Sequence, residues 1–132
     1  MAPWLLVLAM FHPQQAAVPA SASVRALDYE FFKARVQPVF LAKREGHARC
    51  YVCHRGSGAG TGYLQVLAPG ATTWADAQTR MNFESIKRFV QPGEPRHSRL
   101  LMRPLHEQSG GDAFHGGGKH WTAQDDPEWQ TL

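Results

Sequence analysis

The sequence predicts a small all-α domain in which long glycine-rich loops separate short helices. Two segments, 27–40 and 73–90, repeat apolar residues at the spacing of an amphipathic helix. Two others, 55–62 and 109–118, hold so many glycines that a regular helix is not expected there. Once the amino-terminal segment is set apart, about 110 residues remain, which is the size of one small domain.

The amino-terminal segment predicts export. Residues 4–11 (WLLVLAMF) form an apolar run of eight, which is too short for a bilayer span of about 20 residues. Ala20, Ser21 and Ala22 form an A-x-A-like cleavage site. We therefore expect a secretory signal peptide at residues 1–22, a linker at 23–27 and one domain at 28–132, located in the periplasm or on the extracellular face.

The first predicted helix covers residues 27–40 (LDYEFFKARVQPVF). Asp28 is a suitable N-cap, because its carboxylate can accept an unpaired N–H of the first turn. Pro38 should kink or end the helix, because it lacks a backbone N–H. Gly46 then separates this helix from the next element.

Three further helices are predicted downstream. The first starts at Thr73 or Thr79 and stops before Pro92 and Gly93. Its expected apolar stripe comprises Trp74, Ala77, Met81, Ile86, Phe89 and Val90. A short helix over residues 96–102 follows, with Leu100 and Leu101 as core candidates, and Asp125 or Asp126 with Pro127 begins the last one.

The strongest chemical signal is the run CYVCH, which contains the chain's two cysteines, Cys50 and Cys53, followed by His54. In a helix, positions i, i+3 and i+4 lie on one face. Two thiols can then reach the two vinyl groups of one porphyrin while the imidazole points at its iron. C-x-x-C-H is the attachment pattern of c-type haem, with the histidine as proximal axial ligand. The sequence thus predicts one covalent haem c held by these three residues.

Different interpretations of the two cysteines are weaker. A thioredoxin-like redox couple normally lies in a βαβ context, whereas no β-rich, alternating run precedes Cys50. A structural zinc site needs further ligands at zinc-finger spacing, and the chain has no second C-x-x-C. The two remaining interpretations are that the cysteines form a disulfide, or that the C-x-x-C-H pattern occurs by chance.

Further motifs accompany CYVCH: F-x-x-x-V-x-P-V-F from Phe32 to Phe40, QPGEPRHSRLL at 91–101, HGGG at 115–118 and DDPEWQTL at 125–132. With these motifs the chain resembles a bacterial monohaem cytochrome c domain, in particular the planctomycete-type cytochrome C family. The resemblance covers residues 28–132. It implies a small cytochrome c-like helical fold, with the second axial ligand supplied by the loop after the S-x-L-L helix.

The resemblance also implies a distal ligand. Many relatives carry a Met-Pro-Pro motif in this loop, whereas the corresponding stretch here reads FHGGGKHW and has no methionine. His115 lies about where the family methionine would fall and is the expected sixth ligand. The competing possibilities are an open position or one of Met102, His106, His120 and His97.

The formal charge of +3 bears on partners. Residues 33–55 contain six basic residues against one acid, Glu45. The six basic residues are Lys33, Arg35, Lys43, Arg44, Arg49 and Arg55. They predict either a basic collar that steers an acidic redox partner or an ordinary solvated helix face. Neither nucleic acid nor a small-molecule substrate is expected, and residues 56–62 lack the ending of a phosphate-binding loop.

The expected function is electron transfer by a six-coordinate haem whose iron cycles between Fe(III) and Fe(II), without catalysis. Bis-histidine ligation would lower the reduction potential relative to a Met/His pair. A second possible function is that of a haem subunit in a larger membrane redox complex, a filament or a homo-oligomer. A third is that of a haem enzyme or gas sensor, which requires an open distal position.

Overall fold

Helices are the main regular structure of the chain. The computed structural model describes residues 26–56 and 62–132. The predicted signal peptide, residues 23–25 of the linker and residues 57–61 of the first glycine-rich loop lie outside the described residues. In the described part, strand pairing is limited to two isolated bridges, Arg55 with Leu64 and Leu105 with Trp121. Across these same ranges, no helix is both long enough and apolar enough to cross a membrane.

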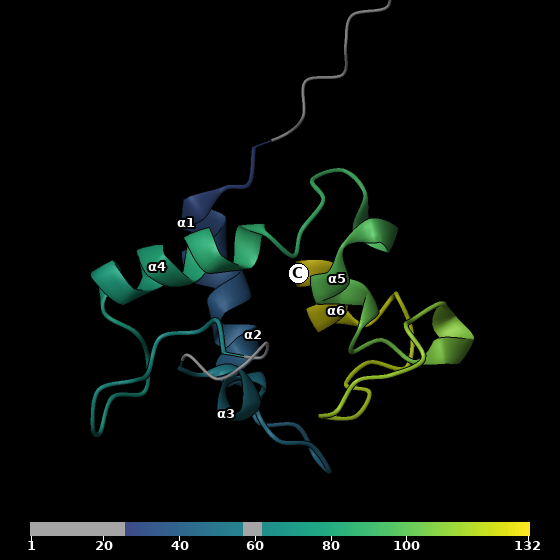
Figure 1. Ribbon diagram of the computed structural model, residues 1–132, viewed down its shortest axis with the longest axis horizontal. Coiled ribbons are helices and arrows are strands. Elements are labelled where there is room, and N and C mark those ends of the chain that lie inside the picture. Colours follow the sequence, from purple (N-terminus) through teal and green to yellow (C-terminus); the bar gives the residue numbers. More distant parts are fainter. Residues whose placement is uncertain (1–25, 57–61) are drawn as a thin grey trace, which may run out of the picture.

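A continuous helical rod at residues 29–41 runs vertically through the left half of the view in Figure 1. It consists of α1 (Tyr29–Phe31), a π-helical turn (Phe32–Val36) and α2 (Gln37–Leu41). Asp28 caps it as predicted, because its Oδ1 accepts the N–H of Phe31 at 3.0 Å.

Pro38 does not end this rod, which continues to Leu41. The N–H of Gln37 donates to the carbonyl of Phe32, five residues earlier, and this bond belongs to the π-helical turn. The wider turn accommodates a proline that has no N–H for the usual i to i−4 bond. Of the two predicted effects of Pro38, an end of the helix is therefore wrong, because the rod continues and changes to a π-helical turn just before the proline.

The longest helix, α4 (Asp76–Lys87), crosses this rod in Figure 1. It begins neither at Thr73 nor at Thr79, so both predicted starts are wrong. Ala75 occupies the N-cap position, and its N–H donates to Oε1 of Gln78 at 3.2 Å. A glutamine one turn into the helix thus replaces the expected hydroxyl cap.

The buried face of α4 is more polar than expected. Its buried residues are Thr79, Asn82 and Ile86. Oδ1 of Asn82 accepts the N–H of Gln65 at 2.7 Å, and this bond explains a buried amide there. Met81 is 47% exposed and Ala77 is also exposed, so the predicted stripe is wrong at both positions.

The carboxy-terminal half is built from four short helices. They are a 3₁₀ turn at Pro95–His97, α5 (Arg99–Met102), a 3₁₀ turn at Glu107–Ser109 and α6 (Pro127–Thr131). Buried Ser98 divides the single helix expected over residues 96–102. The last helix begins as predicted, with Asp126 as the N-cap and Pro127 in the first turn.

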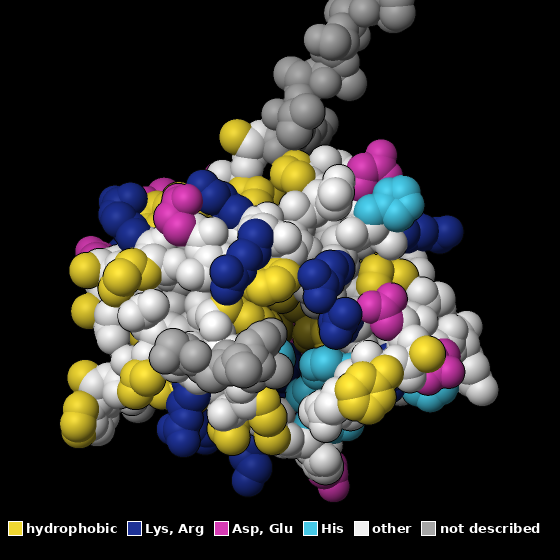
Figure 2. Space-filling view, viewed as in Figure 1, with side chains coloured by type: hydrophobic (Ala, Val, Ile, Leu, Met, Phe, Trp, Pro, Cys, Tyr) yellow, Lys and Arg dark blue, Asp and Glu magenta, His cyan; other side chains and the backbone are white. Residues whose placement is uncertain are grey.

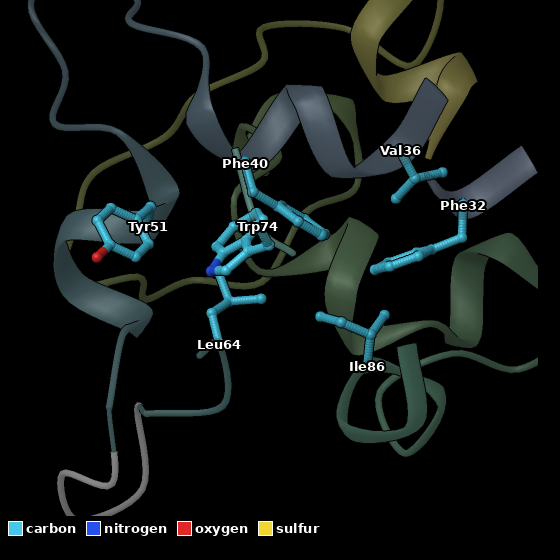
Figure 3. Close-up of a cluster of buried hydrophobic side chains, with 7 residues drawn as sticks. All are labelled: Phe32, Val36, Phe40, Tyr51, Leu64, Trp74 and Ile86. Carbon is cyan, nitrogen blue, oxygen red and sulfur yellow. The ribbon is translucent and has the colours of Figure 1, made fainter. Parts of the chain in front are cut away.

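Two hydrophobic clusters hold these elements together. The first contains Phe32, Val36, Phe40, Tyr51, Leu64, Trp74 and Ile86, and Figure 3 shows these side chains gathered between the rod, α3 (Cys50–His54) and α4. The second contains Val39, Leu101, Met102, Leu105, Trp121 and Trp129. Half-buried Leu132 packs against both clusters. The first cluster therefore fixes α3, and the second fixes α5, α6 and the loop between them.

Candidate functional site

A cavity of about 320 Å³ lies between α3, α5 and the loop at residues 114–121. Its volume is within the range of ligand pockets, about 300–1,000 Å³. Apolar side chains form much of its wall, namely Phe40, Tyr63, Phe89, Leu100, Pro104, Phe114, Trp121 and Leu132. Figure 2 shows histidine, lysine and arginine side chains gathered beside a hollow with an apolar floor on this face.

The CYVCH helix, α3, contributes Cys50, Cys53 and His54 to this wall. Between them, Tyr51 points into the first cluster, and its hydroxyl oxygen accepts the N–H of Leu67 at 2.9 Å. Val52 is 49% exposed. One helical turn thus turns both thiols and the imidazole to the cavity while the tyrosine anchors the turn, as the motif spacing predicts.

Backbone contacts also hold the end of α3 in place. Arg55 is extended, so the helix stops at His54. The carbonyl of His54 accepts the N–H groups of both Tyr63 and Leu64, each at 2.9 Å. The Tyr63 ring stacks on the His54 imidazole with 4.6 Å between centroids and 29° between planes. The orientation of this histidine is therefore set by backbone and ring contacts together.

The two cysteines are free thiols. Cys50 is half-buried, and burial raises its pKa above the ordinary value, although the nearby Arg44 partly offsets this effect. Nη1 of Arg44 donates to Sγ of Cys50 at 3.7 Å. A thiol whose pKa is raised is neutral at neutral pH. The attacking cysteine of a thioredoxin-like couple has a lowered pKa instead, so Cys50 differs from it.

His115 lies across the cavity from the CYVCH helix. Its ring centroid is 6.1 Å from that of His54, and the two planes differ by 16°. A metal–imidazole bond is about 2.0 Å long, so two imidazoles on opposite sides of one ion have centroids about 6 Å apart. The observed centroid separation is close to this value, and the two rings lie nearly parallel.

A hydrogen bond fixes the tautomer of His115. Its Nδ1 is 2.5 Å from the carbonyl oxygen of Gly118. A carbonyl only accepts, so Nδ1 carries the proton and Nε2 presents its lone pair. Histidine ligands of metals commonly donate their other N–H to a carbonyl in this way. Gly118 has φ +80°, a left-handed conformation that allows this tight turn.

Of the competing distal ligands, His120 alone lines the cavity. Its ring centroid is 5.8 Å from that of His115 and 4.8 Å from that of His47. Burial, followed by the positive charge of Arg44, lowers the pKa of His120 to about 4. Its Nδ1 is buried and has no hydrogen-bond partner among the described residues. His120 is therefore a third imidazole at this cavity, and burial keeps it neutral.

Met102, His106 and His97 lie away from the cavity. Met102 is buried in the second cluster. Nδ1 of His106 accepts the N–H of Gln108 at 3.3 Å and caps a 3₁₀ turn. His97 is 73% exposed in its side chain and contacts Glu94 at 3.5 Å. The structure thus gathers both cysteines, His54, His115 and His120 at one cavity and leaves these three side chains outside it.

The predicted basic collar is wrong at Arg44. Its side chain is 12% exposed and forms an ion pair with Glu128 at 2.5 Å. It also donates to the carbonyl of Val39 at 3.0 Å and lies 5.3 Å from the Trp121 ring centroid. This arginine therefore holds α6 against the site from inside instead of presenting charge to a partner.

Several residues of the site were missed at the level of sequence. His47 and Tyr63 contact the candidate ligands, and Arg99 and Arg103 line the cavity from α5 and the residue after it. Arg99 lies in the QPGEPRHSRLL motif, but the motif itself does not indicate that this side chain lines a site. The other three residues belong to no motif, and the packing of distant segments brings all four to the site. In the described ranges, no group of three or more His, Cys, Asp or Glu side chains is arranged to hold a metal ion.

The chain matches no protein-family model, no curated protein and no solved structure. The resemblance to the planctomycete-type cytochrome C family therefore stays a prediction. CYVCH and the cavity that it lines are the features of the chain that indicate a function.

Proposed function

We propose that this chain is an exported electron-transfer protein that carries one covalent haem c. The single observation that carries the proposal is the placement of CYVCH on the wall of an apolar cavity with a second imidazole across it. The donor set fits the group: Cys50 and Cys53 would form the thioethers, and His54 and His115 would be the axial ligands.

Once bound, the haem supplies one-electron chemistry by cycling its iron between Fe(III) and Fe(II). The chain's own residues hold and enclose it. Phe40, Phe89, Leu100 and Trp121 line the cavity and exclude water from it. Gly118 orients His115 through the Nδ1 hydrogen bond. If His54 and His115 both ligate the iron, no position would remain for a substrate, which favours a carrier over a haem enzyme or gas sensor.

The partner is proposed to be another redox protein, either free or within a membrane complex. Outer-sphere transfer requires an approach to the haem edge, and exposed Cys53 and Phe114, which is 76% exposed, lie on the rim of the cavity. Light scattering of the purified holoprotein distinguishes a monomer from a homo-oligomer or a filament.

The first experiment tests attachment. The chain is expressed for export in a bacterial host with a cytochrome c maturation system, together with Cys50→Ala/Cys53→Ala and the matched control His97→Ala. We expect a pyridine haemochrome spectrum typical of two thioether bonds, and a haem mass that survives denaturation, in the wild type and the control only. A wild-type chain without covalent haem would overturn the proposal.

The second experiment identifies the axial pair. Low-temperature EPR and near-infrared magnetic circular dichroism of the ferric protein should give a bis-histidine signature in the wild type and in Met102→Ala. His115→Ala should lose that signature, and its reduced form should bind carbon monoxide rapidly. Unchanged spectra in His115→Ala, with the loss appearing in His120→Ala instead, would move the distal ligand to His120. Rapid carbon monoxide binding by the wild type would reject the carrier function.

A further inference from the structure

The cavity wall combines an apolar surface with three guanidinium groups. Arg49, Arg99 and Arg103 line it, whereas none of the described lining residues has an acidic side chain. A pocket of this composition suits a ligand with an apolar body and anionic groups at its edge. The charge of the lining is thus an observation separate from the CYVCH motif.

Arg99 and Arg103 are one helical turn apart on the same face. Arg103 keeps helical dihedral angles after α5, and its N–H donates to the carbonyl of Arg99 at 3.3 Å. Like charges at i and i+4 repel each other. An anion between the two guanidinium groups would convert this repulsion into attraction, because guanidinium binds carboxylate through paired N–H donors.

Neighbouring side chains orient the two arginines without neutralising them. The Arg99 guanidinium carbon lies 5.8 Å from the ring centroid of Phe89, which also lines the cavity. Nε of Arg103 lies 3.7 Å from Oδ2 of Asp112, and both side chains are about half exposed, so this ion pair is weak. Nζ of Lys119 donates to the carbonyl of Arg103 at 3.1 Å and adds another positive charge.

We propose that Arg99 and Arg103 form a carboxylate clamp that binds a propionate of the haem. The proposal rests on the proposed function, because the propionates belong to the haem that CYVCH would attach. The clamp orients the porphyrin edge opposite the thioether bonds and places positive charge beside the iron. Both arginines are positioning residues, since they act on the haem periphery and not on the metal.

The test uses the ferric and ferrous holoprotein. Arg99→Gln and Arg103→Gln are compared with Arg96→Gln, which removes an exposed arginine of the adjacent 3₁₀ turn that does not line the cavity. We expect the propionate bending band in resonance Raman to shift in both clamp variants and to stay fixed in Arg96→Gln. The reduction potential should fall in both clamp variants, because a nearby positive charge disfavours Fe(III).

Arg103→Lys separates the clamp from a simple charge effect. Lysine keeps the charge but lacks the planar fork, so we expect a shifted propionate band with a potential close to that of the wild type. If the glutamine variants fail to mature, Arg103→Lys and Arg99→Lys decide the question. Propionate bands identical to the wild type in every clamp variant that matures overturn the proposal. A wild-type chain without a haemochrome spectrum refutes the proposed function, and the clamp with it.

Discussion

Ser98→Ala tests how the cavity wall formed by α5 is held in place. The Ser98 residue is 1% exposed, and its Oγ accepts the N–H of Gln91 at 2.9 Å and donates to the carbonyl of Glu94 at 3.2 Å. Alanine leaves the Gln91 N–H without this partner, and a buried unpaired donor costs about 1–3 kcal/mol. Because Gln91 itself is exposed, we expect the lower part of this range, about 1.5 kcal/mol.

The loss should appear as a lower free energy of unfolding of the holoprotein. For a domain of about 110 residues, each kcal/mol shifts Tm by about 4–5 °C, so the variant should melt about 7 °C below the wild type. The assay is guanidinium and thermal unfolding followed by far-UV circular dichroism. Ser85→Ala on α4 is the matched control, because the described structure gives that half-buried hydroxyl no hydrogen bond. A Ser98→Ala loss below about 0.5 kcal/mol, the range of neutral surface changes, would refute the reasoning.

Two further predictions concern the loop that carries His115, the proposed distal ligand. Gly111→Ala should lower thermal stability and disturb the EPR signature of the proposed axial pair, because its Cβ would lie 1.9 Å from the carbonyl oxygen of Leu105. His97→Ala, which changes an exposed side chain away from the cavity, should leave both unchanged. The lowered pKa of His120, about 4, lies below the unfolded value of about 6.5. Between these values the unfolded chain binds more protons, so His120 contributes stability above pH 6.5 that is lost as the pH falls towards 4. Denaturant unfolding across this window should show a smaller acid loss in His120→Gln than in the wild type or His97→Gln, and equal losses would contradict the burial of His120.

Local signals in the sequence predicted the helix boundaries that depend on local chemistry. Asp28 and Asp126 are N-caps in the structure because their carboxylates accept N–H groups two or three residues away, within the same turn. The start of α4 was missed because Gln78, inside the helix, supplies the cap. The buried face of α4 differs from the predicted one because it includes Asn82. The Asn82 amide can be buried because it accepts the N–H of the distant Gln65, and hydrophobic periodicity does not reveal such a bond.

The candidate site likewise contains some residues that local spacing predicts and others that only tertiary packing brings in. The side chains of CYVCH share a face because one helical turn determines their directions, so spacing alone places them together. The inward position of Arg44 depends on Glu128, a residue of the last helix. Arg99 and Arg103 line the cavity, and the intervening Leu101 and Met102 are buried in the second cluster. Such placements follow from tertiary packing, and no local pattern encodes them.

The position of the cavity between the two hydrophobic clusters would give the proposed haem ligation a structural role. The CYVCH helix belongs to the first cluster through Tyr51. The distal loop belongs to the second, because His106 N–H donates to the carbonyl of Trp121 at 2.9 Å, and His120 N–H donates to that of Pro104 at 2.8 Å. These bonds close the loop at its base, so a glycine-rich segment still presents His115 at a defined place. A haem attached to one cluster and ligated from the other would join the two halves, and the small core would gain apolar surface from the porphyrin that its own side chains do not supply.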